Sequence, residues 1–454
     1  MKKREFLAMG GAVPLMLAGC GGNGSGSAPV RLVNASVGYP LLGFMDESTQ
    51  ATTADVAYGN ASPYENVQAG AVGLTLTVAG ASATPAQVRT ISKDQRYSLV
   101  AYGFENELKQ VLITESTITP DAGKANVNVL NTSVDIGAVD VYLSATKDLS
   151  VSTLIASSIV GVSSSQFAGI LAGSYFITVV GANSIAKGIS DVRFQTPVAI
   201  TLTALQIMTI ILTPGASGVL ANAILLTQGA ASAATPPANY LNSTARLRAV
   251  TAVSGMSASV VGANTNGAVT LLASSTTPQY SNYFVVNTGT APVVTVNGAA
   301  VTVLQDTTNT TTGVVTTATA VLAAGGDYTL MVYLDGSGTP TAKVVEDNNT
   351  APVTSQGVKF RLINLASNNQ GLQLSMSVNS ISIASNIPYA TASAYTEITT
   401  PQTTNSTAEV FNGADSLVQH TQVMTLPNIF TDIVVSIDPS TGAVKDFFRS
   451  ASGT

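Results

Sequence analysis

Short apolar runs separated by turn residues make up most of the chain. The runs are rich in Val, Ile, Thr and Tyr, which favour strands. Several alternate between apolar and polar positions, as residues 73–78 and 198–203 do, which is typical of half-buried strands. Turn sequences such as Asp335-Gly336 separate the runs. Strands repeating at intervals of about 8–12 residues predict β-sandwiches, so we expect an all-β fold.

A strand sequence recurs four times along the chain. The copies begin at Arg31, Asn128, Arg246 and Arg361, which are 97, 118 and 115 residues apart. The first copy reads Arg31-Leu32-Val33-Asn34, and the third has Ala249 where the others have Asn. Repetition over this length predicts four similar structural units.

An aromatic residue marks a second point in each copy. It follows a turn of small residues and lies 33 to 39 positions after the start of the copy; the four are Tyr64, Phe167, Tyr283 and Tyr395. Copies one and four share a further tyrosine six positions earlier, Tyr58 and Tyr389. We expect these tyrosines to lie in the core rather than to form an exposed carbohydrate-binding platform.

Changes in composition set the limits of the units. Residues 1–19 are expected to be a signal peptide and residues 20–29 a lipid-anchored flexible tether. The four expected sandwiches are residues 30–122, 123–229, 244–349 and 357–454, with linkers at 230–243 and 350–356. The predicted fold class is all-β, with tandem immunoglobulin-like β-sandwich domains after a lipoprotein signal peptide. No Cys-Trp-Cys signature is present, so the immunoglobulin likeness is architectural.

The N-terminus has the order of a secretion signal. Three basic residues at positions 2–4 precede an apolar stretch at 6–18, which is shorter than the roughly 20 residues that a bilayer requires. The stretch ends in Leu17-Ala18-Gly19-Cys20, which resembles the bacterial lipobox. That resemblance implies that Cys20 is acylated and becomes the mature N-terminus. Gly21, rather than Asp, implies sorting to the outer membrane.

The first two copies resemble a bacterial family of secreted domains, the domain of unknown function numbered 4397. The resemblance rests on the lead strand at 30–36, on the Tyr58 and Tyr64 turn before an alternating strand, and on residues 171–179 of copy two. For copies three and four it rests on internal alignment. The family implies an immunoglobulin-like sandwich at the cell surface or in the periplasm, and it implies no catalytic residues.

Composition excludes several classes of chemistry. Charged residues are 10% of the chain, against about 25% in an ordinary domain, and the net charge is −6. One His and one Cys are too few for a zinc site or a disulfide framework. The scarcity of Lys and Arg argues against nucleic-acid binding. We therefore expect no metal, no cofactor and no nucleic-acid partner.

The candidates for chemistry are few. His420 has no catalytic motif around it and is expected to be an exposed strand residue. Asp135 and Asp140 are the nearest acid pair in copy two, and turn or strand-edge roles are favoured over catalysis. Asp327, Asp335 and the run Asp347-Asn348-Asn349 could offer oxygens to Ca²⁺, but no Asp-x-Asp-x-Asp spacing supports such a site. We expect a protein that is not an enzyme.

Two long stretches, 194–245 and 249–305, carry no charge. Surface without fixed charges costs less to desolvate, so we expect a contact between domains or between molecules here, including self-association through residues 194–305. Residues 198–212 are strongly apolar but are expected to form two strands that meet near 204–206 rather than a membrane span.

The expected function is that of a lipid-anchored cell-envelope protein, located in the outer membrane and attached through Cys20. It would act as a non-enzymatic tandem β-sandwich module for binding, adhesion or surface structure. A periplasmic envelope scaffold is the alternative, and a surface hydrolase or carbohydrate-active protein is less favoured. The sequence does not identify the partner.

Overall fold

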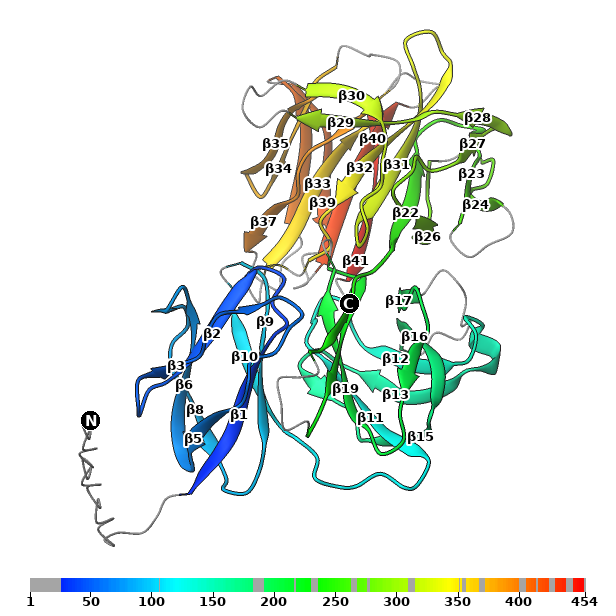
Figure 1. Ribbon diagram of the computed structural model, residues 1–454. Coiled ribbons are helices and arrows are strands. Elements are labelled where there is room, and N and C mark those ends of the chain that lie inside the picture. The colour runs from blue at the N-terminus through cyan, green and yellow to red at the C-terminus, as the bar shows by residue number, and fades with distance from the viewer. Residues whose placement is uncertain are drawn as a thin grey trace, which may run out of the picture.

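The structure is a computed structural model of the 454-residue chain, shown in Figure 1. It describes residues 26–105, 107–182, 192–215, 218–229, 236–262, 268–275, 278–308, 315–350, 352, 357–366, 372–399, 406–413, 415–423, 429–437 and 444–452. Cys20 and the expected signal peptide lie outside the described residues.

Eight β-sheets pack in pairs as four β-sandwiches, numbered 1 to 4 along the chain (Figure 1). In each sandwich the lead strand lies in one sheet, called here the central sheet, and the other sheet is called the outer sheet. The all-β prediction is confirmed. Among the described residues the one helical element is the short 3-10 helix η1 (Leu149–Val151).

Sandwich 1 has a four-stranded central sheet in the order β10-β9-β1-β5. The central strands are β1 (Ser27–Asn34), β5 (Glu65–Gln68), β9 (Tyr97–Tyr102) and β10 (Lys109–Thr114). The outer strands are β2 (Leu41–Asp46), β3 (Ala51–Thr52), β4 (Val56–Ala57), β6 (Gly70–Val78), β7 (Ala81–Ser82) and β8 (Gln87–Ile91).

Sandwich 2 has a central sheet of its own with the same arrangement and one additional edge strand, β21. This strand leads to sandwich 3. The central strands are β11 (Lys124–Asn131), β14 (Ser163–Ser164), β15 (Ala168–Leu171), β19 (Ile207–Pro214), β20 (Ala221–Thr227) and β21 (Ala238–Tyr240). The outer strands are β12 (Val139–Ser144), β13 (Thr153–Ile159), β16 (Gly173–Gly181), β17 (Val192–Gln195) and β18 (Ile200–Leu202).

Sandwich 3 has the widest central sheet, because β29 and β30 add to its edge. The central strands are β22 (Thr244–Thr251), β25 (Gln279–Tyr280), β26 (Phe284–Asn287), β29 (Val303–Thr308), β30 (Val315–Thr319), β31 (Asp327–Leu334) and β32 (Pro340–Asp347). The outer strands are β23 (Ala258–Val261), β24 (Ala268–Leu272), β27 (Val294–Val296) and β28 (Ala299–Val301).

Sandwich 4 repeats the arrangement of sandwich 1. The central strands are β33 (Gly357–Asn364), β36 (Thr391–Ala392), β37 (Thr396–Thr399), β40 (Ile429–Ile437) and β41 (Val444–Ser452). The outer strands are β34 (Leu374–Val378), β35 (Ile381–Ile387), β38 (Ser406–Asn412) and β39 (Asp415–Val423).

The lead strands β1, β11, β22 and β33 occupy the same place in their sheets. Each pairs in parallel with a later strand of its own unit, namely β9, β19, β31 and β40. The register places Arg31 opposite Ser98, Asn128 opposite Thr209, and Arg248 opposite Thr329. The parallel pairing places the start of each unit beside its last third.

The lead strands are buried on both faces. One face of each central sheet packs on its own outer sheet, which gives four separate apolar cores. The other face packs against a neighbouring sandwich: sandwich 1 on sandwich 2, and sandwich 3 on sandwich 4. In Figure 1 the pair 1–2 fills the lower half and the pair 3–4 the upper half. Consecutive sandwiches in a pair therefore lie side by side rather than in an extended row.

The apolar segment 198–212 forms two strands, as predicted. Ile200–Leu202 is β18 in the outer sheet and β19 begins at Ile207 in the central sheet, with Leu205 between them at a φ of 65°. In the described part of the chain, no helix has the length and apolar character needed to cross a membrane.

The charge-free region contributes to both pair interfaces. Ile211 and Ile224 of sandwich 2 contact sandwich 1, and Val250 and Tyr280 of sandwich 3 contact sandwich 4. The expected contact between domains is thus present within the chain. Self-association through residues 194–305 stays a prediction.

Candidate functional site

A buried asparagine closes the end of three lead strands. The Nδ2 atom of Asn34 donates to the carbonyls of Tyr39 and Val56, and Asn364 donates in the same way to Leu372 and Ile387. Asn131 donates to the carbonyls of Gly137 and Ile159. Each side-chain oxygen also accepts from the backbone two residues later. One amide thus joins the lead strand to the outer sheet.

The third copy is offset from its predicted alignment by two residues. Thr251, not Ala249, accepts from the backbone two residues on, at Val253. Ser281 Oγ accepts from the Ala249 N–H just as Ser62 Oγ accepts from the Leu32 N–H. Ala249 is therefore equivalent to Leu32, and Arg248, rather than Arg246, is equivalent to Arg31.

We expect Asn364→Ala to lower the free energy of unfolding of the pair 3–4 by about 2 kcal/mol, because two buried carbonyls lose their donor. Chemical denaturation followed by circular dichroism measures this loss. Asn66→Ala, at an exposed position of β5, is the matched control. Equal stability of the two variants would show that the amide does not hold the lead strand.

The aromatic landmark residues cover the lead-strand arginines. Each follows a serine that accepts a hydrogen bond from the lead strand: Ser62, Ser165, Ser281 and Ser393. The ring of Tyr64 lies 4.8 Å from the Arg31 guanidinium carbon. The corresponding distances are 4.7 Å from Arg248 to Tyr283 and 4.5 Å from Arg361 to Tyr395. Copy two has Asn128 and Phe167 at these positions.

In the pair 1–2 the arginine site joins the two sandwiches. Arg31 Nη2 lies 2.7 Å from Glu115 Oε1 and donates at 3.0 Å to the carbonyl of Thr227, in sandwich 2. Arg31 and Glu115 are 5% and 2% exposed. The Tyr64 hydroxyl donates to Glu115 at 2.7 Å. Burial raises the pKa of Tyr64, and Glu115 adds to the rise, so this hydroxyl stays protonated.

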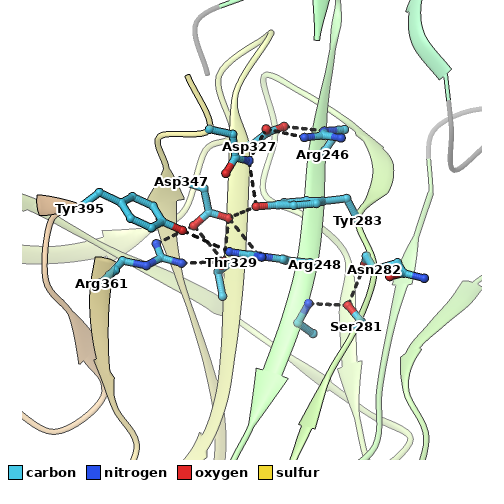
Figure 2. Close-up of polar contacts among 12 residues, drawn as sticks. Arg246, Arg248, Ser281, Asn282, Tyr283, Asp327, Thr329, Asp347, Arg361 and Tyr395 are labelled. Atoms are coloured by element: carbon cyan, nitrogen blue, oxygen red, sulfur yellow. Dashed lines mark hydrogen bonds and ion pairs between the residues drawn. The ribbon is translucent and has the colours of Figure 1, made fainter. Parts of the chain in front are cut away.

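In the pair 3–4 one carboxylate holds arginines from both sandwiches (Figure 2). Asp347 Oδ1 lies 2.6 Å from Arg361 Nη1, and Asp347 Oδ2 lies 3.3 Å from Arg248 Nε. Tyr283 also donates to Asp347. Asp347 has no exposed surface and Arg361 is 1% exposed. Charges this deeply buried are tolerated only when paired, so the cluster fixes sandwich 4 on sandwich 3.

A second ion pair supports the cluster. Arg246 donates through Nε and Nη2 to the two oxygens of Asp327, at 2.7 and 2.6 Å. Asn349 Nδ2 donates to Asp327 at 2.6 Å and to the Tyr283 hydroxyl at 3.0 Å. Two parallel hydrogen bonds fix the orientation of the guanidinium as well as its position.

Within the described side chains, the acid at this site comes from the first sandwich of each pair. Glu115 and Asp347 follow or end the last central strand of sandwiches 1 and 3. The equivalent residue of sandwich 2 is Gln228, whose side chain accepts from Ser116 N and donates to Thr209 Oγ1. In the pair 1–2, a sandwich with its own Arg and acid thus meets one that has Gln228 in place of the acid. This asymmetry favours pairing of sandwich 1 with sandwich 2.

The acidic residues that were considered as calcium ligands have other partners in the structure. Asp327 and Asp347 are engaged with arginines, and Asp335 accepts from the N–H groups of Ser337 and Thr339 in its own hairpin turn. Within the described residues, no group of three or more His, Cys, Asp or Glu side chains is placed to hold a metal ion.

The remaining candidates are dispersed. His420 lies in β39 opposite Ala408, in the outer sheet of sandwich 4. Asp140 lies on β12, an interior strand of its sheet rather than an edge, and accepts from the Ser158 N–H at 2.7 Å, while Asp135 is buried in the loop after β11. Tyr58 and Tyr389 lie at the two pair interfaces, where their hydroxyls bond Thr213 Oγ1 and the Leu334 carbonyl.

Sequence reasoning identified the lead-strand arginines and the aromatic landmark but missed their acidic partners. Glu115 and Asp347 each stand at the end of the closing strand of an odd-numbered copy. This shared position is the sequence feature that could have identified the two acids as partners of the arginines.

Comparisons with known proteins give one family and distant structural similarities. A search of curated proteins found no matching sequence. A candidate cell adhesion protein from Bacteroides uniformis is similar over 50% of this chain and 99% of its own, with 9% identity and a TM-score of 0.18. The Bacillus anthracis TIE protein is similar over 87% of this chain and 65% of its own, with 9% identity and a TM-score of 0.14.

The family model of a domain of unknown function, DUF4397, matches residues 28–142. The match contains sandwich 1, the lead strand β11 and part of β12. It therefore includes Arg31, Tyr64 and Glu115, the three side chains that meet at the pair interface. The resemblance seen in the lead strand and the Tyr58–Tyr64 turn is thus confirmed for residues 28–142, which are similar to the DUF4397 domain.

Proposed function

We propose that the chain is a lipid-anchored cell-envelope protein that acts, without catalysis, as a rigid module for binding, adhesion or surface structure. The observation that carries this proposal is the pair architecture. Buried ion pairs lie at both pair interfaces. Arg361–Asp347 joins sandwich 4 to sandwich 3, and Arg31, which is paired with Glu115 inside sandwich 1, donates to the Thr227 carbonyl of sandwich 2. Such pairs fix orientation, and the sheets on the outside of each pair then present stable surfaces to a partner.

The anchor in this proposal is the thioether-linked lipid at Cys20. The residues from Cys20 to the start of β1 at Ser27 would act as a short Gly- and Ser-rich tether, three residues shorter than the 20–29 expected from the sequence. The lipid, rather than charge, supplies attachment, because the chain without residues 1–19 has 16 basic and 24 acidic residues.

We expect Cys20→Ala to move the protein from the membrane fraction to the soluble fraction and to abolish labelling by palmitate. Fractionation and labelling of cells that produce the wild-type or the variant chain measure both effects. Ser25→Ala, in the same tether, is the matched control. Membrane association that persists in Cys20→Ala would overturn the anchor.

Proteinase K treatment of intact cells separates surface display from a periplasmic scaffold. Surface display predicts digestion before lysis, whereas a protein that survives until the cells are lysed is periplasmic. Proteinase K suits this chain better than trypsin does, because only 19 of 454 residues are Lys or Arg.

A further inference from the structure

The solvent side of the outer sheet of sandwich 3 is made of uncharged strands. This sheet has the strand order β24-β23-β27-β28, and none of the four strands contains Asp, Glu, Lys or Arg. In Figure 1 the sheet lies at the periphery, on the side of sandwich 3 away from sandwich 4. We call this surface the neutral face; its outward residues are Ser259, Val261, Thr270, Val293, Thr295 and Ala300.

The strand registers place short side chains in a row across the neutral face. Ser259 pairs with Thr270 on one side and with Thr295 on the other, and Thr295 pairs with Ala300. The residues next to them along the strands, such as Val260, point into the core of the sandwich. A row of short side chains leaves a flat surface, which a second sheet can approach closely.

The neutral face loses little when water is removed from it. Ser259 Oγ and Thr295 Oγ1 lie 2.6 Å apart and bond each other. Beside this row Val261 and Val293 are 40% and 63% exposed, and the Val261 N–H donates to the Val293 carbonyl. Covering the face therefore keeps these bonds, buries apolar surface and leaves no charge unpaired.

The other three outer sheets carry an acidic residue on their solvent side. In sandwich 1 Glu47 accepts a hydrogen bond from Thr75, an outward residue of β6. Asp140 on β12 and Glu409 on β38 each lie between two residues that point into the core, so their own side chains point outward. Charged residues on exposed sheets oppose association between sheets. The neutral face lacks this protection.

We propose that the neutral face is the contact surface for a second copy of this chain, which binds face to face about a two-fold axis. The net charge of the chain is −6, so two copies repel each other in general, whereas two neutral faces meet without like charges. A two-fold contact needs a self-complementary surface, and a flat row of Ser, Thr and Ala is self-complementary.

A second copy fits this face better than other kinds of partner do. A charged partner gains no ion pair from it, and the six outward residues include no aromatic ring on which a sugar could stack. The dimer goes beyond the proposed function, because it doubles the number of surfaces that one assembly presents.

Sedimentation velocity of the full chain carrying Cys20→Ala tests the proposal, because this variant cannot associate through a lipid. We expect a concentration-dependent equilibrium between monomer and dimer. Adding Ala300→Glu places a carboxylate on each side of the contact, so the dissociation constant of the dimer should rise at least about tenfold, and Thr270→Glu should act in the same way. Ala81→Glu, at an exposed position of β7 in sandwich 1, is the matched control and should leave the dimer unchanged.

A photocrosslinking amino acid at position 300 identifies the occupant of the face in cells. A crosslinked product of twice the mass of the chain supports the proposal, whereas a product that contains a different protein, or no product, overturns it. A chain that stays monomeric at every concentration also overturns it, as do Ala300→Glu and Thr270→Glu chains that are folded by circular dichroism and dimerise as before. None of these outcomes bears on the lipid anchor.

Discussion

Asp347→Asn lowers the free energy of unfolding of the pair 3–4 by about 3–5 kcal/mol, the range measured when one partner of a buried ion pair is removed. Asp347 is fully buried and contacts Arg361 and Arg248, which come from different sandwiches. An amide keeps the shape but removes the negative charge that balances both guanidiniums. Urea denaturation followed by far-ultraviolet circular dichroism measures the change.

An exposed ion pair provides the control for this variant. Asp121 lies 2.9 Å from Lys124, and the Asp121 side chain is 77% exposed. Solvent screens such a pair, so Asp121→Asn should leave the unfolding midpoint unchanged. If Asp347→Asn behaved like Asp121→Asn, the cluster in Figure 2 would not be what fixes sandwich 4 on sandwich 3.

The repeat was predictable from the sequence because it depends on local patterns. The lead strands, the aromatic landmark and the two strands of segment 198–212 all follow from short motifs with turn residues beside them. Each of these features is present in the structure, and only the alignment of the third lead strand is offset, by two residues. Periodicity is sufficient for such elements, since hydrophobic alternation and turns act over a few residues.

The offset in copy three has a physical cause. Arg246 and Arg248 are two residues apart on one strand, so their side chains lie on the same face of the sheet. Both positions therefore satisfy a pattern of a basic residue before an apolar strand. Two hydrogen bonds distinguish them, from the Val253 N–H to Thr251 and from the Ala249 N–H to Ser281, and the second joins residues far apart in the sequence.

The face-to-face pairing was not predictable from alternation. A strand buried on both faces has few polar positions, and β33 is buried at every residue although it contains Lys359 and Arg361. A charged residue in such a strand is usually expected to face solvent. Its burial depends on an acidic residue on another strand, as that of Arg361 depends on Asp347. No short sequence motif indicates such an ion pair.

The interface of the pair 1–2 should be equally sensitive to charge, because its centre is apolar. We expect Ile211→Asp to lower the stability of this pair by about 3–5 kcal/mol, the combined effect of losing a buried Ile side chain and burying a carboxylate. Ile211 has no exposed surface and packs with Val33, Val100 and Ile224 between the two central sheets.

The Ile211→Asp substitution also distinguishes the apolar interface between two sandwiches from the apolar core inside one sandwich. Ile211 faces sandwich 1, while its neighbour Ile210 faces the core of sandwich 2 itself. Ile211→Asp should therefore release hydrogen-exchange protection first on β1 and β20 at the interface, before the outer sheets open. Ile118→Asp, at a position 72% exposed, is the matched control and should change neither stability nor exchange. Unchanged protection of β1 in Ile211→Asp would mean that sandwiches 1 and 2 fold without support from each other, and the buried lead strand would then need another explanation.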